Sequence, residues 1–266
     1  MDLKDTVHLV TGGSSGIGKA TAQLLVEKGA MVAITGRDAV KLERVAGQIG
    51  AFAIQADVSK EEDVLRTYDT VLKEFGRLDG LINNAGIGGG WAGVDELNMD
   101  AMRAVYDVNV FGAAMMGSRA AQILKEQASG CIVNIASTAA LKGFAKGTIY
   151  ASSKWALRGI TQCWQADLRP FNVRVILINP SEVATAFGDP SRVEREAAPN
   201  KLRSEEIAHA IVTAMQMDPR GFIPELAVFA TNSLVGLNVL RTEAGLVVTL
   251  FAVCGCRNDS RTRRIT

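Results

Sequence analysis

Cysteine and histidine are scarce in this sequence, and their scarcity argues against two classes of site. The 266 residues include only four cysteines, too few and too scattered for the framework of a disulfide-rich protein. The two histidines, His8 and His209, supply no cluster with metal-ligand spacing. We therefore expect no metal site and a reducing compartment. The cysteines are Cys131, Cys163, Cys254 and Cys256.

An excess of charge and an export signal are also lacking. The formal net charge is +1, and no basic tract interleaved with aromatic residues crosses the body of the chain, so we expect no nucleic-acid partner. The first residues, Met1–Asp5, lack the basic and apolar regions of a signal peptide. We expect a cytoplasmic protein that acts on a small molecule.

What the sequence has is the size and pattern of one large α/β domain, with 48% hydrophobic residues. An apolar run, Val7–Val10, leads into a glycine-rich loop and a helical pattern through Lys28, and a second apolar run, Met31–Ile34, follows. This βαβ unit is typical of dinucleotide-binding folds, in which glycines let the backbone approach a pyrophosphate at the helix N-terminus. The predicted cofactor-binding residues here are Gly12, Ser14, Ser15, Gly16, Ile17 and Gly18.

The end of the second predicted strand should contact the adenosine ribose of the cofactor. A carboxylate there would accept hydrogen bonds from the ribose hydroxyls, but the position holds Gly36, followed by Arg37. The arginine offers a planar fork to a 2′-phosphate. We therefore predict a preference for NADP(H). Asp38 comes next, and we expect it to open the following helix. NAD(H) is the alternative, because the carboxylate of Asp38 could instead contact the ribose.

The third predicted strand, Phe52–Ile54, is followed by Asp57 and Val58. We predict that Asp57 hydrogen-bonds the adenine amino group and that Val58 lines the ring, and the alternative is that Asp57 only caps the turn. Ser59 and Glu62 have the spacing of a capping box, which predicts the start of another helix.

The fourth predicted strand, Leu78–Ile82, runs into Asn83–Gly86, where small residues let the backbone lie close to a ribose. Further on, Asn109 falls inside a helical pattern, Asp100–Gln127, although asparagine is a poor helix former. A buried amide at such a position usually braces a backbone. The cofactor-binding residues predicted in this part are Asn84, Ala85 and Gly86.

A tyrosine and a lysine four residues apart are the strongest candidates for chemistry. Tyr150 and Lys154 should lie one turn apart on the same face of a helix. A cation beside a phenol favours the phenolate, so the pattern predicts a lowered pKa for Tyr150. Ser137 ends an apolar strand, Cys131–Ala136, thirteen residues before Tyr150. The pair alone is weak evidence, because this spacing occurs by chance in many helices.

Together these motifs resemble the short-chain dehydrogenase/reductase family over roughly residues 5–230. The resemblance implies a Rossmann-type doubly wound parallel sheet of about seven strands with helices on both faces. It implies a homotetramer or homodimer built partly by pairing the helices that hold Asn109 and Tyr150. The motifs that carry it are Thr11-Gly-x-x-x-Gly16-x-Gly18, Asp57, Asn83-Asn-Ala-Gly86, Asn109, Ser137 and Tyr150-x-x-x-Lys154. The catalytic residues that it implies are Asn109, Ser137, Tyr150 and Lys154.

Physical chemistry supports these roles. Tyr150 would protonate the substrate carbonyl oxygen while the nicotinamide delivers hydride to carbon. Lys154 would lower the pKa of the phenol and hydrogen-bond the nicotinamide ribose. Ser137 would give the oxygen a second hydrogen bond, and Asn109 would hold a water that links Lys154 to solvent. A hydrolase function for Ser137 lacks a base, because neither histidine lies in a triad context.

After the sixth predicted strand, Val173–Ile178, the chain departs from the family pattern. Ser181 stands where the family usually has a glycine after Pro180, but we still expect Pro180, Val183 and Thr185 to meet the nicotinamide amide. Residues 181–203 are polar and suit a lid over the substrate. We assign residues 1–230 to a single domain that includes this lid.

The last part of the chain fits the pattern least well. Ser204 is predicted to cap a helix through Met217, and Gly221–Ala230 to form the last strand. Residues 231–266 form an atypical extension, in which the apolar run Ala244–Cys256 precedes a basic end. Its thirteen residues are fewer than the ~20 needed to cross a bilayer as a helix. The alternatives are an element packed on a neighbouring subunit, a membrane-surface anchor, or a stretch unrelated to the fold.

The sequence therefore predicts an NADPH-dependent oxidoreductase that reduces a ketone or aldehyde to an alcohol. A 3-oxoacyl thioester is one plausible substrate, because many relatives of this size act on such compounds. The alternatives are a catalytically silent nucleotide-sensing protein of the same fold and an NAD-dependent alcohol dehydrogenase.

Overall fold

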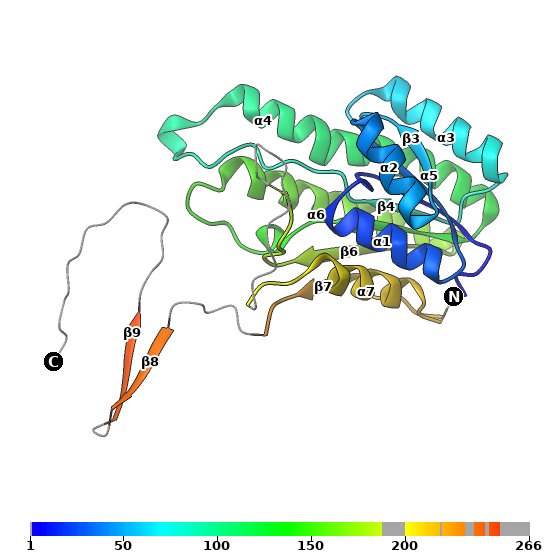
Figure 1. Cartoon of the computed structure of the whole chain (residues 1–266). Coiled ribbons are helices and arrows are strands. Elements are labelled where there is room, and N and C mark those ends of the chain that lie inside the picture. Colours follow the sequence, from blue (N-terminus) through cyan, green and yellow to red (C-terminus); the bar gives the residue numbers. More distant parts are fainter. Residues whose placement is uncertain (1, 188–199, 219, 232–236, 243–244, 251–266) are drawn as a thin grey trace.

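A computed structural model describes residues 2–187, 200–218, 220–231, 237–242 and 245–250 of the chain. Seven parallel strands form one sheet in the order β3-β2-β1-β4-β5-β6-β7 (Figure 1). The order reverses between β1 and β4, which defines a doubly wound sheet and confirms the predicted Rossmann-type fold. The strands are β1 (Val7–Val10), β2 (Met31–Gly36), β3 (Phe52–Gln55), β4 (Gly80–Asn83), β5 (Gly130–Ile135), β6 (Val173–Pro180) and β7 (Glu225–Val228).

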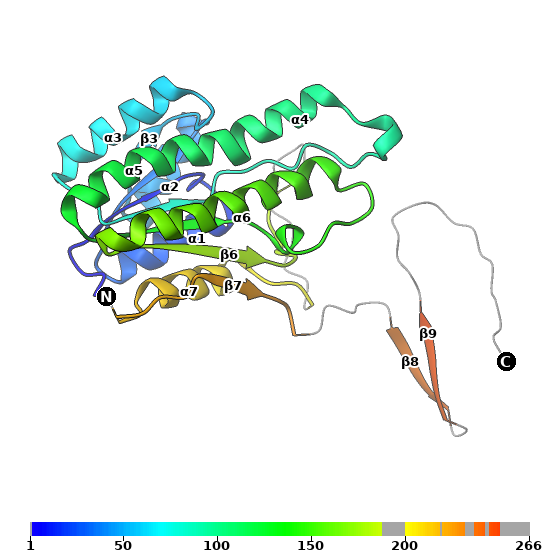
Figure 2. The ribbon, with the colours of Figure 1, turned by 180° about the vertical axis from the view of Figure 1, so that it is seen from behind.

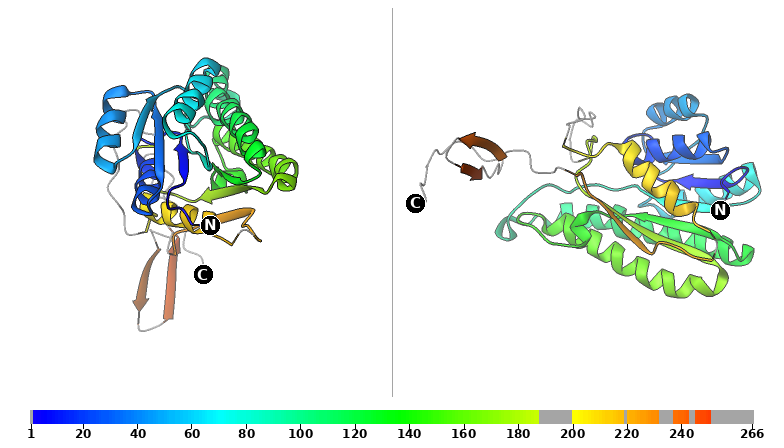
Figure 3. Two further views of the ribbon diagram at one scale, coloured as in Figure 1. Left: turned by 90° about the vertical axis from the view of Figure 1, so that its right-hand side faces the viewer. Right: turned by 90° about the horizontal axis from the view of Figure 1, so that it is seen from below.

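Helices cover both faces of this sheet (Figures 2 and 3). One apolar core lies under α1, α2 and α7, and a second lies under α3, α5 and α6. Neighbouring strand residues enter opposite cores: Leu81 belongs to the second and Ile82 to the first. Burial on both faces explains why the strands read as continuous apolar runs. The helices are α1 (Gly16–Glu27), α2 (Ala39–Ile49), α3 (Glu61–Phe75), α4 (Met99–Tyr106), α5 (Ala113–Gln127), α6 (Thr148–Leu168) and α7 (Ser204–Met215).

The helical pattern predicted for Asp100–Gln127 is not one α-helix. A π-helical segment, η2 (Asp107–Gly112), separates α4 from α5, and Asn109 lies inside it. A π-helical turn adds a residue to the turn and is frequent at functional sites. The poor helix propensity of Asn109 therefore coincides with a real irregularity of the backbone.

Two predicted helix starts are wrong in detail. The capping box of Ser59 and Glu62 does not form, because α3 begins at Glu61 after Lys60 and makes no side-chain cap bond. Ser59 instead donates both its backbone N–H and its hydroxyl to Asp57 Oδ1, at 3.1 and 2.7 Å. The cap of α7 is Arg203 rather than Ser204, because the Arg203 N–H donates to the Glu206 carboxylate at 2.7 Å.

The extension after residue 230 is described only in part. Strands β8 (Leu237–Thr242) and β9 (Gly245–Leu250) pair antiparallel as a hairpin. The rest of the predicted apolar run and the basic end lie outside the described residues. Among the helices of the described part, none is long and apolar enough to cross a membrane.

Candidate active site

The site lies where β1, β4, β5 and β6 end, beside the N-terminus of α1, as expected for a doubly wound sheet. Thr11 joins the first two strand ends. Its Oγ1 accepts hydrogen bonds from the backbone N–H groups of Asn84, at 2.9 Å, and Ala85, at 3.0 Å. The Asn84 amide then donates to the carbonyls of Thr11, at 2.9 Å, and Gly12, at 3.2 Å. This brace fixes the glycine loop against the end of β4.

The glycine loop has the shape of a cofactor cradle. Gly12 has a φ of +64°, and a methyl group there would stand 3.1 Å from the Asn84 amide nitrogen. At Gly18 a methyl group would stand 2.4 Å from the carbonyl oxygen of Gly12, so only glycine fits. The first turn of α1 holds no acidic residue, and Ser15 makes no side-chain cap bond. Its positive dipole end is therefore suited to a pyrophosphate.

The end of β2 holds Gly36 and Arg37, the residues predicted to lie beside the ribose. Gly36 ends the strand, and the exposed Arg37 forms no ion pair with any described residue. Asp38 is the N-cap of α2, and its Oδ1 accepts a hydrogen bond from Lys41 N at 3.0 Å. The carboxylate that follows Arg37 in the chain is therefore already used by a helix.

Asp57 also serves the backbone. Its Oδ1 accepts the two bonds from Ser59, so Asp57 does cap the turn after β3. Its own N–H donates to Asp63 Oδ2 at 2.8 Å. Val58 is buried in the core beneath α3 and α5, at 7% exposure. The predicted contact of Asp57 and Val58 with the adenine ring stays a prediction, because these hydrogen bonds and this burial involve the protein alone.

Tyr150, Lys154 and Ser137 come together at this edge. The two helical residues lie on the first turns of α6, with Lys154 Nζ 5.8 Å from the centre of the Tyr150 ring. Ser137 follows β5 and shares a side-chain hydrogen bond with Tyr150. The Lys154 ammonium donates to the carbonyl of Ile135 at 2.9 Å, so β5 holds both partners of the tyrosine.

The pKa values of the pair shift in the directions that burial dictates. Burial raises the pKa of Tyr150 to about 12, and the hydrogen bond with Ser137 opposes the rise. Burial lowers the pKa of Lys154 to about 8. The predicted lowering of the Tyr150 pKa by the cation is therefore wrong for the protein without ligands. Desolvation outweighs the attraction of a charge that lies beside the ring.

Asn109 is buried, and its side chain is nearly saturated with hydrogen bonds. Oδ1 accepts from Ile87 N at 2.8 Å, and Nδ2 donates to Ile87 O at 3.0 Å and to Ser153 Oγ at 3.1 Å. The amide thus holds the loop after β4 against α6. A methyl group at Gly86 would lie 3.3 Å from Asn109 Oδ1 and 3.7 Å from Lys154 Nζ, so Asn109 and Lys154 approach the same glycine.

The segment after β6 returns to the glycine loop. A methyl group at Gly16 would stand 3.2 Å from the side chain of Thr185, which is 9% exposed. Val183 forms a parallel bridge with Leu202, and Pro180 is the last residue of β6. Pro180, Val183 and Thr185 therefore lie in the segment that runs from the end of β6 back to the glycine loop. Most of the predicted lid, residues 188–199, lies outside the described residues.

Two aromatic side chains that the sequence did not single out contact the ring of Tyr150, and a third contacts one of them. The ring centre of Phe187 lies 5.4 Å from that of Tyr150, and the ring centre of Trp91 lies 6.2 Å from it. Phe144 lies 5.6 Å from Trp91. The three come from separate loops, so no regular spacing in the sequence pointed to them. Thr11 and Ser153 were also missed as bracing residues.

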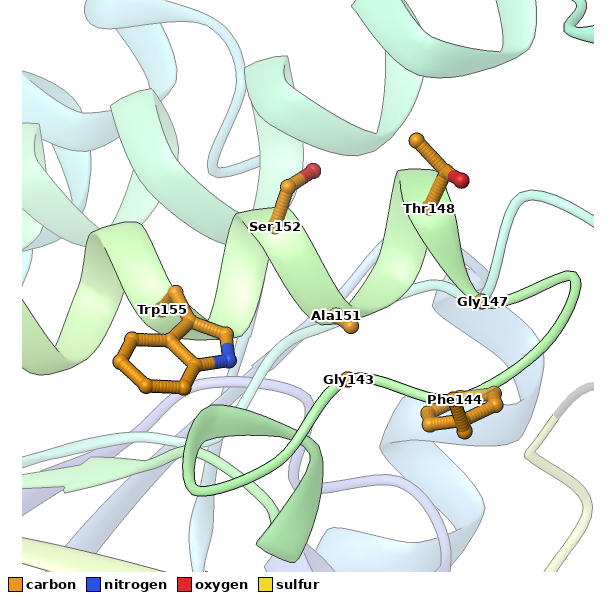
Figure 4. A pocket seen from close by; sticks show the side chains of 7 residues that line it. All are labelled: Gly143, Phe144, Gly147, Thr148, Ala151, Ser152 and Trp155. Atoms are coloured by element: carbon orange, nitrogen blue, oxygen red, sulfur yellow. The ribbon is translucent and has the colours of Figure 1, made fainter. Parts of the chain in front are cut away.

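A hollow of about 440 Å³ lies beside the first turns of α6 (Figure 4). Its lining includes Phe144 and Trp155 but not Tyr150, Ser137 or Lys154. Within the described residues, no group of three His, Cys, Asp or Glu side chains is placed to hold a metal ion. The hollow therefore contains none of the side chains predicted to be catalytic.

Comparison with known proteins decides the family. Residues 6–196 match the family model described as short chain dehydrogenase. The chain belongs to the short-chain dehydrogenase family. This short-chain dehydrogenase is 34% identical over 235 residues to an uncharacterized oxidoreductase of Staphylococcus saprophyticus, covering 86% of this chain and 98% of that protein. A counterpart in Staphylococcus aureus is 33% identical over 229 residues, covering 85% and 97%.

Solved structures of similar proteins agree with this family. An alcohol dehydrogenase from the archaeon Thermococcus sibiricus, complexed with 5-hydroxy-NADP, has a TM-score of 0.79 and 27% identity, with 86% and 97% of the chains covered. A 3-ketoacyl-(acyl-carrier-protein) reductase from Brucella melitensis, complexed with NADH, has a TM-score of 0.79 and 29% identity, with 87% and 100% covered. The short-chain dehydrogenase described here is accordingly an oxidoreductase of the NAD(P)-dependent type.

Proposed function

We propose that this enzyme reduces a ketone or aldehyde to an alcohol with NADPH, and that Tyr150 is the proton donor. The observation that carries the proposal is the contact of Tyr150 with Ser137, with the buried Lys154 one turn away, at the edge lined by the glycine cradle. The bound nicotinamide nucleotide would supply a hydride to the carbonyl carbon. The chain's own residues supply the proton and the polar contacts.

The shifted pKa values fix the protonation states of Tyr150 and Lys154 before the reaction. With a pKa of about 12, Tyr150 keeps its proton at neutral pH and is ready to give it to the oxygen that gains charge. Ser137 stands where its hydroxyl stabilises the same oxygen. Lys154 remains mostly protonated below its pKa of about 8, and its charge stabilises the phenolate that forms.

Asn109 and Lys154 complete the proposed path for protons. Because Asn109 Nδ2 donates both of its hydrogens within the protein, a water could bond only to the remaining lone pair of Oδ1 or to a backbone carbonyl of the π-helical segment. Such a water would reach Lys154 beside Gly86. In this proposal the π-helix positions the proton path, while Tyr150 carries out the transfer.

Arg37 supports the proposed preference for NADPH. It is exposed beside Gly36, where relatives that bind NADH would use an acid, and Asp38 already caps α2. A charge-assisted contact between the guanidinium and a 2′-phosphate would favour NADPH about ten- to a hundredfold over NADH.

We further propose one domain over residues 1–230, with a lid at 181–203, that assembles as a homodimer or homotetramer. Apolar side chains at the helices near Asn109 support the assembly, because Met99 and Phe111 are 49% and 55% exposed. They line a second hollow of about 330 Å³ together with Met102 and Tyr106. Burying this face against a second copy would remove its apolar area from water.

Replacing Tyr150 by phenylalanine tests the proton donor. With NADPH and a panel of ketones, aldehydes and a 3-oxoacyl thioester, we expect kcat to fall about a hundred- to ten-thousandfold while the Kd of NADPH changes little. The matched control is Tyr106→Phe, which removes the same hydroxyl from α4. Near-normal turnover in Tyr150→Phe would show that the acid is misassigned.

The same panel separates the alternative functions. If the unmodified protein binds NADPH but no carbonyl compound is reduced and no alcohol is oxidised, a nucleotide-sensing role is favoured instead. If the unmodified protein reduces carbonyls with NADH in preference to NADPH, the cofactor assignment falls and the catalytic residues stand.

A further inference from the structure

Three exposed aromatic rings lie in a row that includes Tyr150, because two of them contact its ring and the third contacts one of those two. Trp91 follows β4, Phe144 precedes α6, and Phe187 follows β6, so each of three strand ends contributes one ring. Trp91 meets Tyr150 nearly edge to face, at an interplanar angle of 75°, and Phe187 tilts against it at 55°. Phe144 continues the rim beyond Trp91 at 52°. We call Trp91, Phe144 and Phe187 the aromatic rim.

Core packing does not account for the rim. Trp91 is 56% exposed, Phe144 47% and Phe187 39%, and the described apolar clusters do not include them. Aromatic side chains contribute most to stability when they are buried, so three half-exposed rings add little to folding. Their gathering at one reactive phenol points instead to a ligand that covers them.

The rim also lacks charge on its ring faces. Within the described residues, the cations that lie over rings are seated on Phe171, Tyr150, Trp155 and Phe222. Trp91, Phe144 and Phe187 therefore offer apolar surface with electron-rich faces and electron-poor edges. Such surfaces can pair with an aromatic ring of a ligand, because ring pairs at 4.5–7 Å contribute beyond their buried area.

We propose that the aromatic rim binds the substrate of the reaction proposed above, and that this substrate is an uncharged ketone or aldehyde with an aromatic ring near the carbonyl. The proposal rests on the proposed carbonyl reduction and narrows it to a substrate class. Trp91 and Phe187 both pack against the ring of Tyr150, so a substrate whose oxygen meets the phenol brings its adjacent carbon skeleton close to them. Phe144 would contact the far end of a larger substrate.

A matched pair of ketones tests the substrate class. 2-Tetralone and 2-decalone have the same bicyclic skeleton, and in both the carbonyl is separated from the distal ring by saturated carbon, so only the aromaticity of that ring differs. We expect kcat/KM with NADPH to be about three- to tenfold higher for 2-tetralone, the range that one or two aromatic contacts supply. A ratio of one or below would overturn the proposal.

Two tryptophans give a matched pair of variants. Trp91→Leu keeps an apolar side chain in the rim but removes the ring, and we expect it to abolish the preference for 2-tetralone. Trp155→Leu makes the same change on the same helix as Tyr150, at a side chain that is 47% exposed and lines the hollow beside α6 (Figure 4). The control should keep the preference. Phe187→Leu is the second rim variant, in case the loop of Trp91 does not tolerate leucine.

Binding without turnover separates this proposal from the proposed reaction. The Kd values of both ketones are measured by ligand-observed NMR with NADP⁺ bound, so that no hydride is available, in the unmodified protein, Trp91→Leu and Trp155→Leu. Tighter binding of 2-tetralone that only the rim variant loses supports the aromatic site, even if neither ketone is reduced; in that case the reaction falls and the site stands. Equal binding of the two ketones by all three proteins overturns the site, whatever the activity.

Discussion

Replacing Lys154 by methionine should change how the stability of the protein depends on pH. Lys154 is 4% exposed, its ammonium bonds to the carbonyl of Ile135, and none of the ion pairs among the described residues involves it. A buried charge without an opposite charge favours loss of its proton, which lowers the pKa from 10.5 to about 8.

The sign and size follow from linkage. Between pH 8 and 10.5 the unfolded chain binds more protons at Lys154 than the folded protein does, so the free energy of unfolding rises with pH. Integrating the two titrations gives a penalty of about 3 kcal/mol at pH ~7 that shrinks by about 2 kcal/mol at pH ~9.5. Tyr150 has the opposite effect, because its pKa is raised from 10 to about 12. The unfolded chain loses this proton before the folded protein does, so the free energy of unfolding falls between pH 10 and 12.

Urea unfolding at pH ~7 and ~9.5 measures this effect, because both values lie below the window in which Tyr150 titrates. The quantity is the difference in unfolding free energy between the unmodified protein and Lys154→Met. It should move by about 2 kcal/mol in favour of the unmodified protein as the pH rises. Lys73→Met, at an exposed position on α3, is the control and should show no such movement.

The comparison across pH removes the other effects of the substitution. The part of the hydrogen bond to Ile135 that does not depend on the charge of Lys154 contributes equally at both pH values and cancels, and the part that does is already contained in the pKa of Lys154. If the difference between the two proteins stays constant from pH ~7 to ~9.5, Lys154 keeps an ordinary pKa and the reasoning from desolvation fails.

Two further predictions concern the cofactor. Arg37→Ala should erase most of the about ten- to hundredfold preference for NADPH in kcat/KM, and Gly36→Asp should reverse it once Ser14, 3.3 Å from a methyl group at Gly36, gives way slightly. A preference for NADH in the unmodified enzyme would refute this assignment. Asn84→Ala removes the hydrogen bonds to the carbonyls of Thr11 and Gly12. We expect weaker NADPH binding and a loss of about 1–3 kcal/mol in the free energy of unfolding. Unchanged NADPH affinity would show that the brace does not shape the glycine loop.

The architecture was predictable because the strands of this sheet are buried on both faces. Runs such as Val7–Val10 stay apolar throughout, so the positions of β1 to β6 could be read to within two residues. The edge strand β7, Glu225–Val228, is half exposed and is much shorter than the predicted Gly221–Ala230. The glycine loop was equally informative, because only glycine tolerates the positive φ of Gly12 and the close approach at Gly18.

The irregular parts were less predictable, because local spacing does not reveal which hydrogen bond forms. The apolar pattern of Asp100–Gln127 passes through η2 unbroken, and only the presence of Asn109 marked the irregularity. Ser59 had the spacing of a capping residue, but its hydroxyl donates a hydrogen bond to the nearby carboxylate of Asp57 instead. The aromatic rim joins three loops far apart in the sequence, so only the fold could bring its members together.

The pKa of Tyr150 was predicted in the wrong direction for an instructive reason. The spacing of Tyr150 and Lys154 correctly placed the two on one helix face, but proximity alone does not decide a pKa. The ammonium is turned toward the carbonyl of Ile135, and the phenol is largely shielded from water, so desolvation dominates. Sequence spacing shows which groups meet, whereas burial decides which protonation state they favour.

The buried charge of Lys154 lowers the stability of the fold and also serves the proposed reaction. Lys154 keeps a buried charge that the free protein does not neutralise with a carboxylate among its described residues, and this charge destabilises the fold at neutral pH. In the proposed reaction the phenol of Tyr150 loses its proton to the substrate, and negative charge then develops beside that ammonium. The interaction is stronger in the transition state than in the free enzyme, which is the condition for a group to accelerate a reaction. A variant that relieves the strain at Lys154 should therefore gain stability and lose turnover together.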